Sequence, residues 1–594
     1  MDHTQLRNRA QEYVSKETDP AFRTEVEALL KAEDWKELED RFYRDLEFGT
    51  GGLRGVIGGG YNRMNSYIVT RATQGLCDYL RSAFPTKQLS ACIAYDSRHY
   101  SDVFSERAAC VFAANGIKAY LFSSLRPTPE LSFAIRSLGA DTGIVVTASH
   151  NPPKYNGYKA YWNDGAQVIP PHDEGIIARV NAVQTIKIMD REKALAAGLL
   201  EMVDSVVDDR YVAMVKSKLM RPELIRRMAG QVKLVYTPLH GTGAKPFERV
   251  MKDLGLEVVT VPEQREPDGD FPTVAFPNPE EAAALKLALE LGKKVSADAV
   301  MATDPDADRL GIAVPNGAGD FTLITGNQLG SLHLDYLLLT RKELGLLPAK
   351  PAVIKSIVTT DLQARIAASY GATCFECLTG FKWIADLMRR FEEDRTGPAS
   401  GGYTFVYGTE ESYGHLIENE VRDKDGISAA ALTAEMTLYW RSKGLGLLER
   451  LDQIYREHGY FEERGISKYF EGPTGMDVMR DIMGGYRKAQ PASLGGIPVR
   501  RIRDVKTGLE WDASSPARSR PVDLPASDVI QWYLEDGTLV TVRPSGTEPK
   551  IKYYILLRTE VGSGESSAAL AAARSASAAK AGAIAADIRK VIGA

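Results

Sequence analysis

The sequence has few cysteines, no excess of basic residues and no long apolar run. Five cysteines among 594 residues are too few, and odd in number, for a disulfide framework, which fits a reducing compartment. The formal net charge of −5 argues against general nucleic-acid binding or a membrane-surface role, because both need a basic excess. The N-terminus is polar and no stretch of about 18 apolar residues occurs. We therefore expect a cytoplasmic protein with neither nucleic-acid nor membrane partners.

Two common kinds of site are also missing from the sequence. Gly241 and Gly243 begin a G-x-G pattern, but Pro246 stands where the third glycine is needed, and no GxxxxGK[ST] occurs. The single CxxC, Cys374 and Cys377, lacks a second pair and is a poor zinc site. The sequence thus offers no evidence for a dinucleotide, P-loop nucleotide or structural zinc site.

Strand-like and helical segments alternate along most of the chain. Residues 1–47 read as helices, whereas the glycine-rich stretch 49–60 predicts neither a regular helix nor a packed strand. Further strands are predicted at 89–98, 116–122, 142–148, 232–241, 256–261, 297–304, 352–360, 372–380 and 403–412, with helices near 104–114, 245–254 and 279–292. This alternation indicates βαβ units and parallel sheets, in which ligands bind beyond the carboxyl ends of strands.

The final part of the chain has a different pattern. Short strands and turns dominate from about residue 456, including an Asp-Gly hairpin signal in LEDGTLVTV, and an alanine-rich helix ends the sequence. We expect four domains, the last a smaller α+β domain. Their predicted limits are 1–205, 206–322, 323–455 and 456–594.

Three aspartates at two-residue spacing follow one predicted strand. In DPDADR, Asp304, Asp306 and Asp308 can converge on one hard cation, since carboxylate oxygens are preferred ligands of Mg²⁺. In the sequence only Arg309 stands beside them to balance their charge, and uncompensated buried carboxylates are costly without a metal. A solvated acidic turn is the alternative. An EF-hand fails, because Arg309 replaces its glycine and Pro315 its glutamate.

The stretch RPSGTEPK has the composition of a phosphate-binding loop. Arg543, Ser545, Gly546 and Thr547 offer a guanidinium, two hydroxyls and free backbone N–H groups, a set that suits a phosphate dianion. Pro-Ser-Gly-Thr is also simply a good turn. Taken alone, the stretch leaves both interpretations open.

The stretch GTEESYGH combines a carboxylate with a hydroxyl. Glu410 and Ser412 are two residues apart and face the same side of an extended chain, which suits adjacent sugar hydroxyls. An acidic surface loop is the alternative interpretation. His415 either donates to a phosphate or is a structural histidine.

Ser149 and His150 stand at the end of a buried strand. A helix N-cap role for Ser149 is disfavoured by Pro152 and Pro153, and a hydrolase nucleophile would need the absent G-x-S-x-G pattern. A hydroxyl that carries a phosphoryl group is the interpretation that also explains a metal site, a phosphate loop, a sugar loop and no nucleotide site. The phosphate would then come from a sugar and not from ATP.

Four stretches, TASHNPPKYNGYK, DPDADR, GTEESYGH and RPSGTEPK, resemble in order and separation the signature loops of the α-D-phosphohexomutases. The resemblance covers about residues 45 to 560. GTGGLRGVIGGGYNRMN and the chain length resemble the branch that contains bacterial phosphoglucomutase and the phosphoglucomutase-2-like enzymes. The resemblance to the family implies a heart-shaped, four-domain α/β fold. Three of the domains are similar and have mixed sheets, and the fourth is a small C-terminal α+β domain of the TATA-box-binding-protein-like type.

The resemblance also implies a mechanism and roles for residues. Ser149 would be a phosphoserine whose phosphate completes a Mg²⁺ shell with the three aspartates, and glucose 1,6-bisphosphate would be the intermediate and activator. Further implied catalytic residues are Arg54, His150, Arg309 and Lys159, the last a general acid/base. Implied substrate ligands are Glu410 and Ser412 for sugar hydroxyls, Thr379, Gly380 and Lys382 for sugar orientation, His415, and Arg543, Ser545, Gly546 and Thr547 for the phosphate that does not react. Relative to the E-x-S-G-H form, this chain departs from the family pattern by one extra residue before His415, in EESYGH.

The implied activity is a phosphoglucomutase that interconverts glucose 1-phosphate and glucose 6-phosphate, as a monomer or homodimer. Phosphomannomutase, phosphopentomutase and glucose 1,6-bisphosphate synthase are alternatives within the family. A Mg²⁺-dependent phosphohydrolase and a catalytically idle sugar-phosphate-binding protein are alternatives from other classes.

Overall fold

The structure is a computed structural model that describes residues 1–49, 51–396, 402–470, 475–515, 517–545, 549–561 and 567–593. The chain forms two compact units, which we describe separately. The first comprises Met1–Gly326, Ala385–Thr396 and Ser412–Tyr439, and the second comprises Asn327–Ile384, Gly397–Glu411 and Trp440–Ala594. Among the helices of the described part, none is both long and apolar enough to cross a membrane.

The first unit begins with three short helices, as predicted for residues 1–47. They are α1 (His3–Lys16), α2 (Pro20–Ala32) and α3 (Trp35–Phe42). Each starts after an aspartate whose side chain accepts a backbone N–H of the first turn, which satisfies one of the unpaired helix donors. The helices hold the glycine-rich loop: Arg41 donates to Gly59 O over 2.9 Å, and Gly59 N donates to Glu25 over 2.7 Å.

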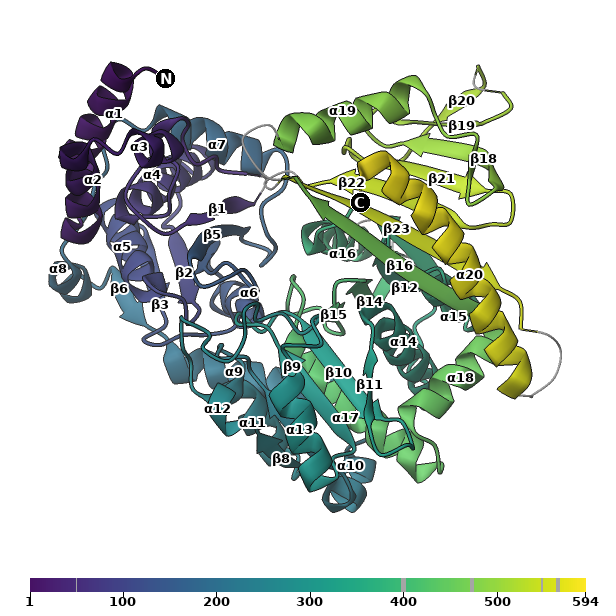
Figure 1. Cartoon of the computed structure of the whole chain (residues 1–594). Helices are drawn as coiled ribbons and strands as arrows, with labels where there is room; N and C mark the ends of the chain where they lie inside the picture. The colour runs from purple at the N-terminus through teal and green to yellow at the C-terminus, as the bar shows by residue number, and fades with distance from the viewer. Residues whose placement is uncertain are drawn as a thin grey trace. The chain divides into compact units, whose positions relative to one another are not determined.

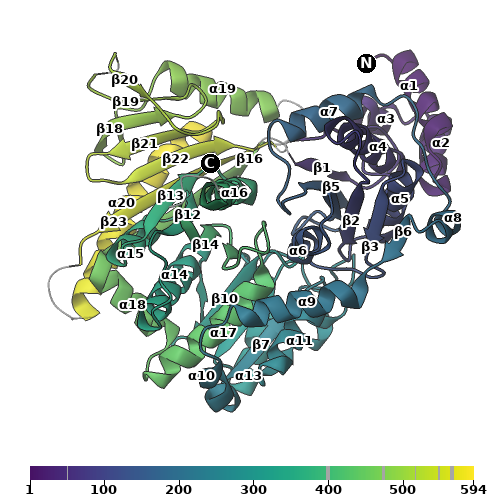
Figure 2. The same cartoon turned by 180° about the vertical axis from the view of Figure 1, so that it is seen from behind.

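The first sheet has six strands in the order β1-β5-β4-β2-β3-β6. They are β1 (Gly52–Val56), β2 (Ser90–Tyr95), β3 (Lys118–Leu121), β4 (Thr142–Val146), β5 (Tyr155–Trp162) and β6 (Leu200–Met202). All five residues of β4 are buried, as expected for an apolar strand covered on both faces. Helices α4 (Ser66–Ala83), α5 (Ser101–Ala114) and α7 (His172–Ala182) form one layer, and α6 (Thr128–Leu138) and α9 (Asp204–Ser217) pack separately from them (Figure 2). Helix α8 (Arg191–Ala196) precedes β6.

One prediction for this sheet is wrong. The glycine-rich stretch was expected to form no packed strand, yet β1 pairs antiparallel with β5 along the sheet edge. The glycines permit this pairing. A Cβ on Gly52 would lie 1.9 Å from Tyr158 O, and its φ of +148° is rarely open to other residues. Because β5 runs antiparallel to β4, the sheet is mixed and not purely parallel.

The second sheet, also in the first unit, has the order β11-β10-β9-β7-β8. Its strands are β7 (Lys233–Thr237), β8 (Glu257–Thr260), β9 (Ala299–Thr303), β10 (Leu310–Pro315) and β11 (Phe321–Ile324). Strands β7, β8 and β9 are parallel, whereas β10 runs antiparallel to both of its neighbours, β9 and β11. The helices of this segment are α10 (Pro222–Met228), α11 (Ala244–Asp253), α12 (Pro262–Arg265) and α13 (Lys286–Val295), and a 3-10 turn, η1 (Ala229–Gln231), follows α10.

The second unit contains a parallel arrangement of β13 (Thr373–Cys377), β12 (Pro351–Ser356) and β14 (Thr404–Glu410). The helices of this unit are α14 (Gly326–Glu343), which enters it at its second residue, α15 (Leu362–Ser369) and α18 (Leu447–His458). Most of α16 (Phe381–Thr396) and of α17 (Gly426–Ser442) belongs to the first unit. The predicted strands at 352–360, 372–380 and 403–412 are thus present. The short strand β15 (Gly414–Leu416) belongs to the first unit.

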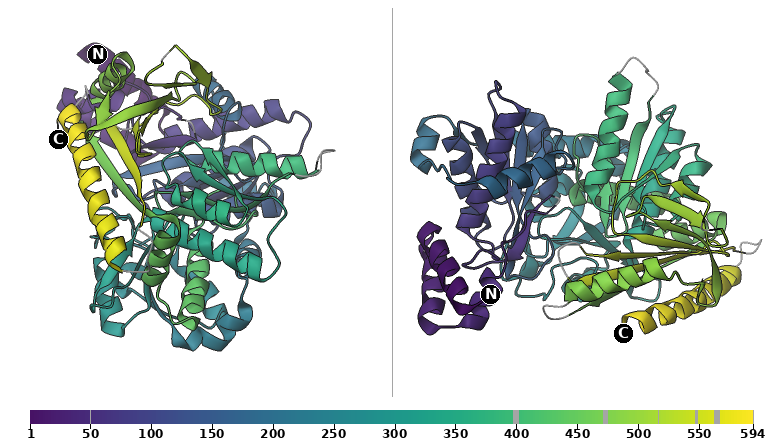
Figure 3. Two further views of the ribbon diagram at one scale, coloured as in Figure 1. Left: turned by 90° about the vertical axis from the view of Figure 1, so that its right-hand side faces the viewer. Right: turned by 90° about the horizontal axis from the view of Figure 1, so that it is seen from above.

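The last sheet is antiparallel throughout, which agrees with the predicted change of pattern. Its strands are β16 (Tyr460–Tyr469), β17 (Ser493–Leu494), β18 (Ile497–Asp504), β19 (Leu509–Asp512), β20 (Ser519–Pro521), β21 (Ile530–Leu534), β22 (Leu539–Pro544) and β23 (Lys550–Thr559). The predicted hairpin joins β21 to β22. Helix α19 (Gly475–Lys488) and the alanine-rich helix α20 (Ser567–Ile592) complete this part, and α20 runs along β16 and β23 (Figures 1 and 3).

We predict that Gly52→Ala weakens the first unit, because the methyl group must displace the backbone of β5. The expected loss is at least about 2 kcal/mol in the free energy of unfolding, measured by urea titration with circular dichroism. Gly230→Ala is the matched control, since no atom lies within 4 Å of its added Cβ. Equal stability of the two variants would contradict this account of β1.

Candidate active site

Ser149 lies in the turn that follows β4 and is 5% exposed. Its φ is +51°, an uncommon left-handed conformation for a non-glycine residue that costs on the order of 1–3 kcal/mol. The turn supports this conformation, since Ser149 N donates to Thr147 Oγ1 over 2.8 Å. As the two prolines indicate, turns and not a helix follow Ser149. The chain then returns as β5, which carries Lys159 opposite Val145 of β4.

The three aspartates lie in the loop after β9 and are at most 1% exposed. One carboxylate oxygen from each lies within 4.8 Å of the others. Ser149 Oγ donates to Asp304 Oδ2 over 2.6 Å. The serine from the first sheet and the aspartates from the second sheet therefore form one cluster within the first unit.

The glycines of LHGTG have a packing role beside this loop. A Cβ on Gly241 would lie 2.3 Å from the Cα of Pro305, and one on Gly243 would lie 2.2 Å from the Tyr236 hydroxyl. Thr242 donates to Pro305 O from both its backbone N and its hydroxyl, over 2.8 and 2.9 Å. The partial G-x-G pattern thus lets two loops approach closely.

Two lysines balance the aspartates, although the sequence showed no cation beside them except Arg309. Lys159 Nζ lies 2.8 Å from Asp306 Oδ2, and Lys424 Nζ lies 2.8 Å from Asp308 Oδ2. Lys424 was not predicted, because it is more than a hundred residues away in the sequence. The only signal in the sequence was the charged stretch RDKDG, which is buried in the structure. There Asp423 accepts a hydrogen bond from the Tyr161 hydroxyl over 2.7 Å, which steadies the loop.

The oxygens of this cluster fit a divalent cation. Among the described residues, Asp306 Oδ1 and Asp308 Oδ1 are buried and accept no hydrogen bond. Unsatisfied buried carboxylate oxygens are costly, and an all-oxygen set of this kind is what Mg²⁺ prefers. The three aspartates can therefore hold such an ion, with the Ser149 hydroxyl beside them.

The charges of the cluster perturb one another. Burial and the neighbouring charges of Asp308 and Asp306 raise the pKa of Asp304 well above its usual range. Burial would also raise the pKa of Asp306, but Lys159 outweighs it and lowers that pKa. Burial lowers the pKa of Lys159, whereas Asp306 and Asp308 raise it by more, so the Lys159 ammonium remains charged.

Three further predicted residues, His150, Arg54 and Arg309, belong to the same region of the first unit. His150 Nδ1 lies 3.1 Å from Ser149 Oγ. Burial and the charges of Arg309 and Arg54 lower the pKa of His150 well below its ordinary value, so its ring is neutral near pH 7. Arg54 is exposed on β1. The Arg309 Nε lies 3.9 Å from both Asp304 and Asp308.

The second half of GTEESYGH also belongs to the first unit. Leu310 N donates to Tyr413 O over 3.0 Å, so this segment lies beside the aspartate loop. Ser412 is half-buried. His415 is 1% exposed, and burial lowers its pKa to about 3. This histidine is neutral and has little access to a ligand.

In the second unit, Glu410 is brought together with the loop after β13. Glu410 Oε1 accepts from Gly380 N over 2.6 Å, and Gly380 has a φ of +110°. Thr379 and Lys382 are half-buried, and Lys382 Nζ lies 5.2 Å from the ring centroid of Trp383. The carboxylate of Glu410 is therefore fixed next to the predicted sugar-orientation loop.

The predicted phosphate loop follows β22 in the second unit. Arg543 lies opposite Lys552 in the β22–β23 pair, and like charges directly opposite are unfavourable without an anion. Burial and Glu410 raise the pKa of Glu411, and the charges of Lys552 and Arg543 offset this rise only in part, so the Glu411 carboxyl lies near both cations. Ser545 N donates to Lys550 O over 2.7 Å. Gly546 and Thr547 lie outside the described residues.

Three family models match the chain. They are phosphoglucomutase/phosphomannomutase α/β/α domain I over residues 45–187, domain II over 209–317 and domain III over 325–458. The chain belongs to the α-D-phosphohexomutase family. It is an intramolecular phosphotransferase of that family, with three mixed-sheet domains and a C-terminal antiparallel-sheet domain.

Curated phosphohexomutases similar to this chain carry two kinds of name. The phosphoglucomutase of Staphylococcus saprophyticus is 35% identical over 87% of this chain and 91% of its own. The human phosphopentomutase is 34% identical over 89% of this chain and 87% of its own. The phosphoribomutase of Saccharomyces cerevisiae is 33% identical over 91% of this chain and 91% of its own. The relatives are thus divided between hexose and pentose activities.

Solved phosphohexomutase structures share the fold. The Paramecium phosphoprotein parafusin, a phosphoglucomutase in its open form, has a TM-score of 0.66 at 18% identity, over 93% of this chain and 95% of its own. A phosphoglucomutase/phosphomannomutase family protein of Burkholderia thailandensis has a TM-score of 0.62 at 21% identity, over 90% of this chain and 97% of its own. At these identities the likeness concerns the fold alone.

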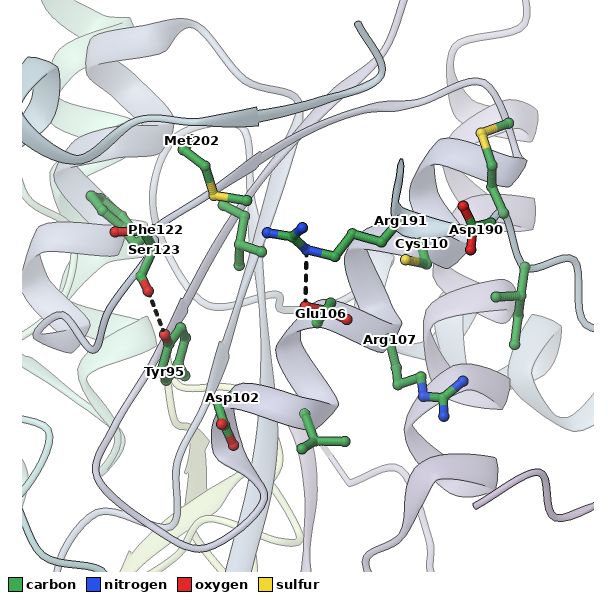
Figure 4. A pocket seen from close by; sticks show the side chains of 14 residues that line it. Tyr95, Asp102, Glu106, Arg107, Cys110, Phe122, Ser123, Asp190, Arg191 and Met202 are labelled. Atoms are coloured by element: carbon green, nitrogen blue, oxygen red, sulfur yellow. Dashed lines mark hydrogen bonds and ion pairs between the residues drawn. The ribbon is translucent and has the colours of Figure 1, made fainter. Parts of the chain in front are cut away.

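A separate cavity of about 620 Å³ lies in the first unit of this phosphohexomutase (Figure 4). None of the predicted site residues lines it. Two pairs of its polar groups interact within the protein: Arg191 pairs with Glu106 over 3.1 Å, and the Tyr95 hydroxyl donates to Ser123 O over 3.1 Å.

We predict that Mg²⁺ stabilises this phosphohexomutase and that Asp308→Asn removes the effect. A cation that binds only the folded state contributes about 2.7 kcal/mol at a concentration of 100 times its Kd. The thermal unfolding midpoint, recorded with MgCl₂ and with EDTA, measures this. Asp320→Asn is the matched control, because Asp320 is an exposed aspartate of the same sheet segment. The metal assignment is wrong if Mg²⁺ stabilises Asp308→Asn as strongly as the parent.

Proposed function

We propose that this phosphohexomutase is a phosphoglucomutase that interconverts glucose 1-phosphate and glucose 6-phosphate through a phosphoserine at Ser149. The observation that supports this most is the 2.6 Å contact between Ser149 Oγ and Asp304 Oδ2 within a buried aspartate cluster. A hydroxyl in this position can carry a phosphoryl group beside a metal site. Mg²⁺, when held by the three aspartates, supplies Lewis-acid stabilisation of the transferring phosphoryl group.

The chain's own residues perform the remaining steps of the proposed reaction. Ser149 Oγ donates its phosphoryl group to a hydroxyl of the sugar phosphate, which forms a 1,6-bisphosphate. After reorientation of that bisphosphate, its other phosphate returns to Ser149. Lys159 carries a proton and gives it to the serine oxygen as that oxygen leaves, and the proton released by the attacking sugar hydroxyl restores the Lys159 ammonium. Arg54 and Arg309 stabilise charge on the phosphoryl oxygens.

Other residues would hold the substrate during transfer. We propose that Glu410 and Ser412 bind sugar hydroxyls, and that Thr379, Gly380 and Lys382 orient the sugar. The phosphate that does not react would bind Arg543, Ser545, Gly546 and Thr547, with Lys552 as an additional cation. Lys424 would hold the Asp308 carboxylate in place for the metal through its 2.8 Å ion pair. Among these groups His415 is best understood as a buried structural residue.

A phosphopentomutase is the second candidate, because the human and yeast relatives carry phosphopentomutase and phosphoribomutase names at 34% and 33% identity. We expect kcat/KM to be highest for glucose 1-phosphate when glucose, mannose and ribose 1-phosphates are assayed side by side with catalytic glucose 1,6-bisphosphate. A preference of tenfold or more for ribose 1-phosphate would replace the glucose assignment and leave the mutase mechanism intact.

We predict that Ser149→Ala removes nearly all mutase activity, a loss of at least about 10⁴-fold in kcat, since the group that carries the phosphate is gone. The protein should still fold and still be stabilised by Mg²⁺. Ser105→Ala is the matched control, because Ser105 is a buried serine of α5 away from the cluster. Normal turnover by Ser149→Ala would refute the phosphoserine mechanism.

A further inference from the structure

Arg98 occupies a central place beneath the Ser149 turn, and no part of the proposed reaction uses it. Its guanidinium donates to four backbone carbonyls of that turn: Ser149 O over 2.5 Å, Pro152 O over 2.9 Å, Tyr155 O over 3.0 Å, and Asn151 O. The side chain is fully buried. The planar guanidinium has several N–H donors in fixed directions and can bond several acceptors at once, whereas the compact ammonium of a lysine cannot.

Asp96 orients Arg98 and the serine together. Its carboxylate lies 3.3 Å from the Arg98 Nε and accepts from Arg98 N over 3.0 Å. The same carboxylate accepts from Thr147 Oγ1 over 2.6 Å, and Thr147 Oγ1 in turn accepts from Ser149 N over 2.8 Å. Asp96 is also bonded to Ser101 Oγ over 2.8 Å. The left-handed backbone of Ser149 is thus held from both its N–H and its carbonyl.

Phe271 covers the other side of Arg98 and comes from the segment between β8 and β9, which precedes the aspartate loop. The guanidinium carbon lies 5.0 Å from the Phe271 ring centroid, a cation–π geometry. Phe271 is 1% exposed and has a φ of +47°, which is strained for a bulky residue. Gly269 allows the loop to approach, because a Cβ there would lie 2.9 Å from Ser97 O.

We propose that Arg98, oriented by Asp96 and covered by Phe271, is the positioning residue that holds Ser149 in its strained backbone conformation and in register with the aspartate cluster. Four carbonyl contacts, one carboxylate and one aromatic ring meet on a single buried guanidinium. They link the turn after β4 to the segment between β8 and β9. The inference rests on the proposed phosphoserine role of Ser149.

The test compares Arg98→Lys with the parent in single-turnover transfer of phosphate from labelled phospho-Ser149 to glucose 1-phosphate. Lysine keeps the charge and loses the fork. We expect the transfer rate to fall about 100-fold, the cost typical of a misplacement of about 1 Å, with KM for glucose 1-phosphate changed less than threefold. Arg63→Lys is the matched control: Arg63 is a buried arginine that pairs with Asp40, and its replacement should leave the transfer rate unchanged.

Two results would overturn the inference. The first is that Arg98→Lys folds and transfers phosphate within threefold of the parent rate. The second is that Arg98→Lys raises KM for glucose 1-phosphate while its transfer rate stays unchanged. If the parent itself transfers no label from Ser149, the proposed function fails first, and that outcome is distinct because it appears before any variant is compared.

A second pair of variants decides the matter if Arg98→Lys does not fold. Thr147→Val removes the hydroxyl that links Ser149 N to Asp96, and Thr147→Ser retains it. We expect a loss of at least tenfold in transfer rate for Thr147→Val and recovery to within threefold for Thr147→Ser. Equal rates for the two variants would contradict the proposed positioning network.

Discussion

The short contact between Ser149 Oγ and Asp304 is the interaction on which the site depends. It joins the end of β4 in one sheet to the end of β9 in another, 155 residues apart in sequence. Both strands are apolar and fully buried, so their carboxyl ends are fixed by the cores of their sheets. A buried hydroxyl and three buried carboxylates can therefore meet reproducibly, as catalysis by pre-organised charge requires.

Burying three carboxylates close together is electrostatically unfavourable, and neighbouring cations offset this cost. Lys159 and Lys424 each balance one aspartate, while two carboxylate oxygens remain for a cation. Arg309 adds a third positive charge, with its Nε 3.9 Å from both Asp304 and Asp308. The turn around Ser149 is strained, and buried hydrogen bonds to its backbone maintain it, which is the usual way a functional conformation is stored in a fold.

Much of this could be predicted from sequence, because strand ends and short polar loops are local features. The nine predicted α/β strands, which correspond to β2–β4, β7–β9 and β12–β14, and the aspartate cluster followed from patterns within about ten residues. The alternation itself predicted parallel sheets, and the mixed sheets followed from the resemblance to the family. Lys424 and Arg98 could not be predicted, because their roles depend on contacts across 116 and more than 50 residues of sequence. The strand β1 was missed for another reason: its glycines indicated a loop, although they serve a close backbone approach to β5.

The most direct test of the account is the phosphorylation state of Ser149. The protein is incubated with glucose 1,6-bisphosphate, and the peptide that contains Ser149 is then analysed by mass spectrometry before and after addition of glucose 1-phosphate. The account predicts one phosphoryl group on Ser149 that is lost to the sugar phosphate when glucose 1-phosphate is added. An unmodified Ser149, or a phosphoryl group that stays in place, would contradict it.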